Sequence, residues 1–166
     1  MKIIDYDPRN GDGLQGDVDY FQIPDHIALS TAEEIPALNG RLIIQEGKAT
    51  GHHHAIELPR RRNFRQETAI ADPVLHVRDT RLRKAFGGAK AKAGTARLYR
   101  DLAAVQSLVR AGELTRADLA IGILVVEGGP VLLSHHEHDS HRIPPGRYYV
   151  GRQVESAGAE ERVVLD

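Results

Sequence analysis

Two histidine-rich stretches, far apart in the chain, carry the side chains best suited to chemistry. Seven of the nine histidines lie in them: Gly51-His52-His53-His54 forms the first, and His135-His136-Glu137-His138 followed by His141 forms the second. Imidazole binds divalent metal ions and also exchanges protons near neutral pH. If the fold brings the two stretches side by side, they predict one shared site.

A metal centre is the first hypothesis for this site. In an extended strand His52 and His54 point to the same face, and His135 joins His138 if the chain turns between them. The chain contains no cysteine, so thiolate ligands are excluded. We therefore expect these four histidines to hold a divalent ion such as zinc, manganese or nickel.

Three neighbouring residues are candidates for the chemistry around that metal. Glu137 could act as the general base on a metal-bound water, and His136 is a second catalytic candidate. His141 could orient a ligand or take part in proton transfer. The leading hypothesis is therefore hydrolysis of an anionic substrate, either a nucleotide or a nucleic acid.

A metal-free alternative uses the same histidines. Two imidazoles can serve as general base and general acid in one displacement. Arginine holds phosphate through paired N–H donors, and the candidate phosphate ligands are Arg60, Arg61, Arg62 and Arg152. This combination predicts a phosphodiesterase or a ribonuclease.

The charge distribution supports a third, non-enzymatic hypothesis. The formal net charge is only −1, but residues 60–100 carry twelve basic and three acidic side chains, a net charge of +9. The segments on either side are acidic. The basic segment could bind nucleic acid or another polyanion, or it could pair with the acidic segments in a homo-oligomer.

Short apolar or alternating runs bounded by glycine and proline predict β-strands along most of the chain. The clearest lie at residues 41–47, 50–58, 121–126, 131–136 and 147–155. Gly128-Gly129 predicts a tight turn that returns the strand at 121–126 into the strand at 131–136.

One helix is predicted from Arg97 to Arg110, because Leu98, Leu102, Val105 and Val109 follow helical spacing and Gly112 follows as a stop. Residues 60–96 are predicted to form a basic, mobile insertion. Residues 1–166 are then expected to be a single domain, mainly β with one or two helices. The expected architecture is a small antiparallel barrel or sandwich, with the helix and basic arm inserted between two strand groups.

The sequence gives no signal for a membrane or for export. The N-terminus has no apolar stretch typical of a signal peptide, and no run approaches the roughly 20 apolar residues of a membrane span. We therefore expect a cytoplasmic protein without membrane contact.

The two histidine motifs, followed by Pro144-Pro145-Gly146 and then Arg152-Gln153-Val154-Glu155, resemble a group of small bacterial and phage-borne proteins with no settled function. Gly-His-x-His and His-x-x-His elements recur in that group, and this resemblance implies His52, His54, His135 and His138 as site residues. His52, His54 and Glu57 are also similar to the first motif of the cupins, which are double-stranded β-helix barrels, although the glutamate comes earlier here.

Overall fold

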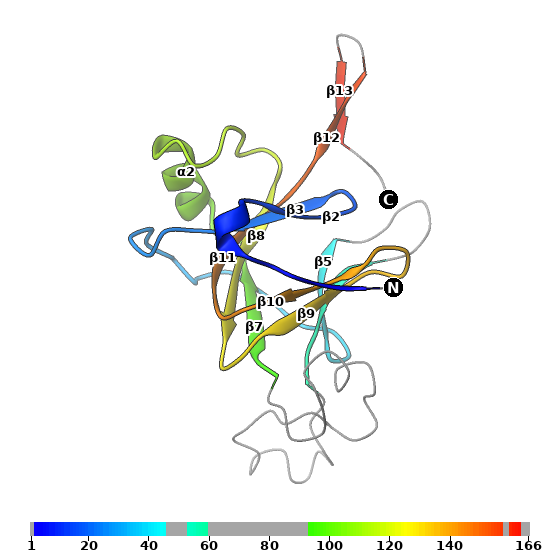
Figure 1. The fold of residues 1–166 in the computed structure, drawn as a ribbon. Helices are drawn as coiled ribbons and strands as arrows, with labels where there is room; N and C mark the ends of the chain where they lie inside the picture. Colours follow the sequence, from blue (N-terminus) through cyan, green and yellow to red (C-terminus); the bar gives the residue numbers. More distant parts are fainter. Residues whose placement is uncertain (1, 46–52, 60–92, 158–159, 164–166) are drawn as a thin grey trace.

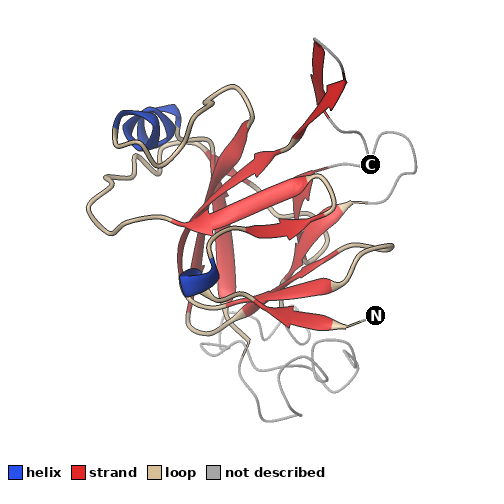
Figure 2. Ribbon diagram, turned by 45° about the horizontal axis from the view of Figure 1, so that its top comes forward, coloured by secondary structure: helices blue, strands red, loops and turns tan. Residues whose placement is uncertain are grey.

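The computed structural model describes residues 2–45, 53–59, 93–157 and 160–163. In this part of the chain two β-sheets form a sandwich, with one α-helix outside it (Figures 1 and 2). The prediction of a mainly β chain with a sandwich architecture is therefore confirmed. His52 and most of the basic insertion, residues 60–92, lie outside the described residues.

The first sheet has five strands, and its order in space differs from the order in the chain. Its strands, from edge to edge, are β1 (Ile3–Asp5), β10 (Ser140–Ile143), β9 (Val131–Ser134), β6 (His54–Glu57) and β5 (Arg41–Gln45). β1 runs parallel to β10, and the other neighbours in this sheet are antiparallel. β6 and β9, which carry or precede the two histidine stretches, are thus adjacent.

The second sheet has six strands and faces the first. Its strands, from edge to edge, are β2 (Gly13–Gln15), β3 (Val18–Gln22), β11 (Gly146–Arg152), β8 (Ala120–Glu127), β7 (Thr95–Tyr99) and β4 (Glu34–Ile35). A hairpin of β12 (Val154–Ala157) and β13 (Glu160–Val163) projects from the body of the molecule (Figure 1). A short 3-10 helix, η1 (Pro8–Asn10), links β1 to β2.

The main core fills the space between the two sheets. Val18 and Leu124 come from the six-stranded sheet, Leu42 and Ile56 come from the five-stranded sheet, and all four are at most 1% exposed. Alternation along β6 points Ile56 inward, and the same period points His54 inward as well. The strand that contributes to the core therefore also carries a histidine into it.

Replacing Leu124 with alanine should lower the free energy of unfolding by about 2–5 kcal/mol. Leu124 is 1% exposed on the central strand β8 and already borders a small apolar hollow between the sheets, so its removal enlarges an empty space. Leu102, which is 65% exposed on the helix, is the matched control, and its alanine variant should stay within about 0.5 kcal/mol of the parent. Urea unfolding of both variants measures the difference, and equal losses would contradict it.

The predicted helix from Arg97 to Arg110 is wrong in its first part. Residues 95–99 form β7, which pairs with β8, and α2 (Leu102–Arg110) begins only after Asp101. Asp101 caps the helix by accepting a hydrogen bond from the Ala104 amide at 3.0 Å. Leu98 belongs to the strand and not to the helix. The apolar residues that appeared to follow helical spacing therefore come from two different elements.

The buried face of α2 also differs from the predicted stripe. Ala104, Val105 and Leu108 pack with Ile123 and Tyr149 on the outer face of the six-stranded sheet. Gly112, with φ at +79°, follows the helix end as expected. No helix among the described residues is both long and apolar enough to cross a membrane.

The turn predicted at Gly128-Gly129 does not join its two flanking strands into a hairpin. β8 and β9 lie in different sheets, so the two glycines turn the chain from one layer to the other. β8 has β7 and β11 on its two sides, which leaves no place for β9 beside it. β9 pairs instead with β6 and β10, and this brings the second histidine stretch next to the first.

Candidate functional site

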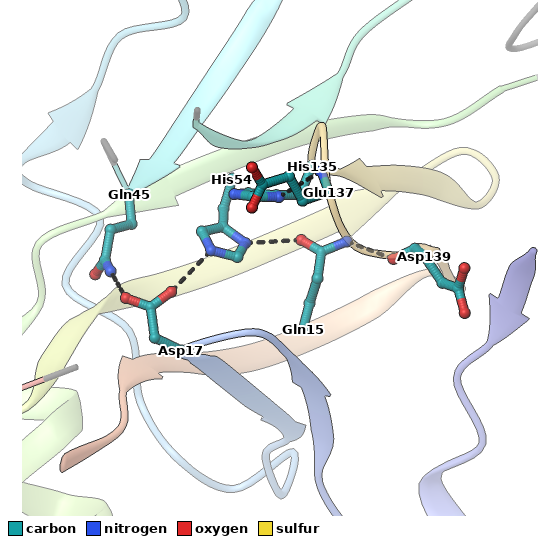
Figure 3. A network of polar contacts seen from close by, with 7 residues as sticks. All are labelled: Gln15, Asp17, Gln45, His54, His135, Glu137 and Asp139. Carbon is teal, nitrogen blue, oxygen red and sulfur yellow. Dashed lines mark hydrogen bonds and ion pairs between the residues drawn. The ribbon is translucent and has the colours of Figure 1, made fainter. Parts of the chain in front are cut away.

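The two histidine stretches meet at a buried cluster of polar side chains between the sheets (Figure 3). His54, at the start of β6, is the innermost of them and is 0% exposed. Its partners, Gln15 and Asp17, belong to the facing sheet and are 1% and 2% exposed. The cluster therefore joins the two layers of the sandwich.

A two-residue turn aims Gln15 and Asp17 at the histidine. β2 and β3 form a hairpin in which Gln15 pairs with Val18, so that only Gly16 and Asp17 connect the strands. Gly16 has φ at +59°, a left-handed conformation that favours glycine and is typical of tight hairpins. The turn thus places an acidic side chain at the end of the sheet, opposite β6.

Both ring nitrogens of His54 have hydrogen-bond partners. Nδ1 lies 2.9 Å from Gln15 Oε1, and Nε2 lies 2.8 Å from Asp17 Oδ1. Asp17 Oδ2 in turn accepts a hydrogen bond from the side-chain amide of Gln45, at the end of β5. Such partners offset the cost of removing a carboxylate and an imidazole from water.

Three imidazole rings gather at this point. The ring centroids of His54 and His135 are 4.3 Å apart, those of His135 and His138 are 4.5 Å apart, and those of His54 and His138 are 6.0 Å apart. The three rings form a triangle. His54 and His135 are its buried corners, at 0% and 3% exposed, and the half-buried His138 is the corner nearest to solvent. The structure thus brings together three of the four predicted metal ligands.

The loop after β9 sets the hydrogen position on His135. The backbone N–H of Glu137 donates to His135 Nδ1 at 3.0 Å, so this nitrogen is an acceptor. A ring that accepts at Nδ1 carries its hydrogen on Nε2 and is neutral. Although the two rings are in contact, the Nδ1 of His135 accepts a hydrogen bond from a backbone N–H, whereas the Nδ1 of His54 faces an amide oxygen.

These ring contacts do not make a metal-binding set. Among the described residues, no group of three histidine, aspartate or glutamate side chains is arranged to hold a metal ion. His54 faces acceptors on both sides, and His135 already accepts at Nδ1. The predicted ligand His52 lies outside the described residues, so the metal centre stays a prediction.

His141 lies inside the core beside the cluster. Its Nδ1 is 2.5 Å from the hydroxyl of Tyr20, which comes from β3 in the facing sheet. Burial lowers the pKa of His141 below its usual value of 6.5; nearby Asp139 opposes this shift and His54 adds to it. Burial also raises the pKa of Tyr20 well above its usual value, so the hydroxyl keeps its proton.

The lowered pKa of His141 predicts a loss of stability in mild acid. The unfolded chain takes up a proton at this histidine as pH falls through about 6.5, whereas the folded chain does so only at lower pH. Below pH 6.5 the stability contributed by neutral His141 should therefore decline, by at most about 1.4 kcal/mol per pH unit, until the folded pKa is reached.

Denaturant unfolding at pH 7.5, 6.5 and 5.5 tests this prediction. The parent protein should lose more stability across this interval than His141→Gln, because glutamine does not titrate. Identical pH slopes for the two proteins would contradict the assignment, whatever their absolute stabilities.

The other predicted site residues lie in different surroundings. His136 and Glu137 are exposed on the loop between β9 and β10, close to His138 in the chain. Arg152, at the end of β11, makes no hydrogen bond to the histidines within the described residues, and its charge acts on Asp118 and Tyr149. Arg60, Arg61 and Arg62 lie outside the described residues.

Glu57, the residue similar to the cupin glutamate, faces away from His54. Successive side chains alternate along β6, so Glu57 lies on the face opposite His54 and Ile56. There it accepts a hydrogen bond from the Ser134 hydroxyl at 2.8 Å and lies 3.5 Å from Arg41. In this arrangement Glu57 and His54 are not co-ligands.

Sequence reasoning missed four members of the cluster: Gln15, Asp17, Tyr20 and Gln45. The sequence did contain one signal for this hairpin. Gly16-Asp17 lies between two short segments in which apolar and polar residues alternate, a pattern typical of two strands joined by a two-residue turn. Nothing in the sequence places that hairpin opposite His54.

No family model, curated protein or solved structure matches this chain. The function is therefore inferred from the geometry and chemistry of the site.

Proposed function

We propose that the protein is a phosphodiester hydrolase that uses histidine general acid–base catalysis and needs no metal. One observation carries this choice over a metal centre: hydrogen-bond partners engage both nitrogens of His54 and Nδ1 of His135. Nitrogens that are already engaged in this way are poorly arranged to donate lone pairs to a metal, whereas the neighbouring histidines of the loop after β9 can still exchange protons.

His138 is the imidazole that meets the substrate in this proposal. It is half-buried at the outer corner of the triangle, whereas His54 and His135 are buried beneath it. A histidine changes its protonation state near neutral pH, so His138 can remove a proton from the attacking water. His136, exposed on the same loop, is the proposed acid in its protonated form.

The reaction balances with these two groups. Water adds to phosphorus as its proton passes to His138, and the ester P–O bond breaks as His136 gives its proton to the departing oxygen. Glu137 is exposed and lies between His136 and His138 in the chain. In this proposal its carboxylate stabilises the imidazolium that forms on His138.

The substrate class follows from charge. The segment of residues 60–100, with its net charge of +9, favours a polyanion, and arginine is well suited to hold phosphate oxygens. We therefore propose a nucleotide or nucleic-acid phosphodiester as the substrate.

Hydrolysis assays in the presence of EDTA test the proposal. Full-length protein is incubated with single-stranded RNA and with bis(4-nitrophenyl) phosphate, with EDTA or with added zinc, manganese or nickel. The expected result is turnover that survives EDTA and a bell-shaped dependence of kcat/KM on pH. Absence of turnover on both substrates under all conditions would overturn the proposal.

Two other outcomes would identify the alternatives. Turnover that EDTA abolishes and one of the metals restores would establish the metal-dependent hydrolase in place of the metal-free enzyme. Salt-sensitive retention of RNA without turnover would instead indicate a nucleic-acid-binding protein.

A further inference from the structure

The side-chain amide of Gln15 can adopt only one of its two orientations. Its Nε2 donates to the backbone carbonyl of Leu133 at 3.0 Å and to that of Asp139 at 2.8 Å. Carbonyl oxygens only accept hydrogen bonds, so rotating the amide would put its own oxygen against two acceptors. The oxygen Oε1 must therefore face His54, as Figure 3 shows.

This orientation determines what His54 Nδ1 does. An amide oxygen is an acceptor, so the nitrogen 2.9 Å away must carry hydrogen and donate. On the opposite side of the ring, Nε2 faces the carboxylate of Asp17, which is also an acceptor. Both nitrogens of His54 then carry hydrogen, and the ring is a buried imidazolium paired with Asp17.

The rest of the cluster is consistent with this assignment. Gln45 donates to the other carboxylate oxygen of Asp17, as it would to an ionised group. His135, whose ring touches that of His54, accepts at Nδ1 and so is the neutral neighbour of a cation.

We propose that Gln15 is a positioning residue that keeps two protons on the ring of His54 and so removes His54 from proton exchange and from metal coordination. Proton transfer in the site then falls to His138 and the exposed residues of its loop. The catalytic part of this inference rests on the proposed function, whereas the hydrogen assignment rests on the contacts alone.

Nitrogen NMR of histidine side chains tests the assignment without any need for turnover. Protein labelled with ¹⁵N-histidine is recorded at neutral pH, and the His54 signal is identified from its absence in a His54→Gln variant. The expected spectrum shows protonated shifts for both nitrogens of His54, with ring protons that exchange slowly with water. A His54 signal with one unprotonated nitrogen in the parent protein would overturn the proposal.

Three variants separate the role of Gln15 from general packing. Gln15→Met removes the acceptor at similar volume, so His54 should lose the Nδ1 proton and keep the Nε2 proton that faces Asp17. Gln15→Glu keeps an acceptor toward His54 Nδ1 and should keep both protons, with its second oxygen protonated so that it donates to the carbonyl of Leu133 or Asp139. Gln45→Met, which leaves both ring contacts intact, is the matched control and should also keep both protons.

A two-proton signal that persists in folded Gln15→Met would overturn the role of Gln15. Should that variant fail to fold, Gln15→Glu and the parent spectrum still decide the assignment, because each makes its own prediction. Failure of the hydrolysis assays would leave the NMR result standing, and failure of the NMR prediction would leave His138 as the proposed base. The proton assignment on His54 and the proposed hydrolase activity can therefore be disproved independently of each other.

Discussion

Asp17→Ala should lower the free energy of unfolding by about 3–5 kcal/mol, the cost of breaking a buried ion pair by removing one partner. Asp17 and His54 are both fully buried at the side chain and are 2.8 Å apart. Without the carboxylate, the Nε2 of His54 and the amide of Gln45 lose their acceptor away from water. The expected loss is a large share of the total stability of a typical domain.

Guanidinium unfolding measures this loss, and Asp118→Ala is its matched control. Asp118 also forms an ion pair, with Arg116, but this pair is exposed to solvent, so its removal should cost far less than the removal of Asp17. The double variant Asp17→Ala with His54→Leu should recover part of the loss, because it removes the orphaned imidazole as well. A loss below about 1 kcal/mol for Asp17→Ala would show that the pair is not formed as described.

His138→Ala should reduce kcat/KM for phosphodiester hydrolysis by a factor of about 10²–10⁴, the usual contribution of a general acid or base. His138 is the only ring of the described triangle that is not fully buried, so it is the one a substrate can reach. Loss of the base should also remove one limb of the bell-shaped pH profile.

His26→Ala is the control for this experiment. His26 is exposed on the loop after β3, outside the histidine triangle, and its replacement should leave kcat/KM within about twofold. Equal activity of the parent and His138→Ala would exclude His138 as the base. A loss confined to KM would assign it to substrate binding.

Local patterns in the sequence predicted much of the sandwich. The strands predicted at residues 121–126 and 131–136 are present as β8 and β9, although β9 ends at Ser134, and alternation along β6 places His54 on one face with Ile56. These predictions succeed because the pleat of a strand, which is a property of the backbone, determines which neighbours share a face. The same local reasoning misread residues 97–101, where a strand and a helix follow each other with spacing that mimics one helix.

Only the tertiary structure decided what His54 touches. The sequence determined that a histidine points into the sandwich and that a second histidine stretch follows β9. The ring's actual partners, Gln15 and Asp17, come from a hairpin in the other sheet. Which hairpin lies opposite β6 depends on how the whole core packs, and no short-range pattern encodes that register. The histidines of the site were therefore visible in the sequence, whereas the partners of His54 were decided only by the contacts between the sheets.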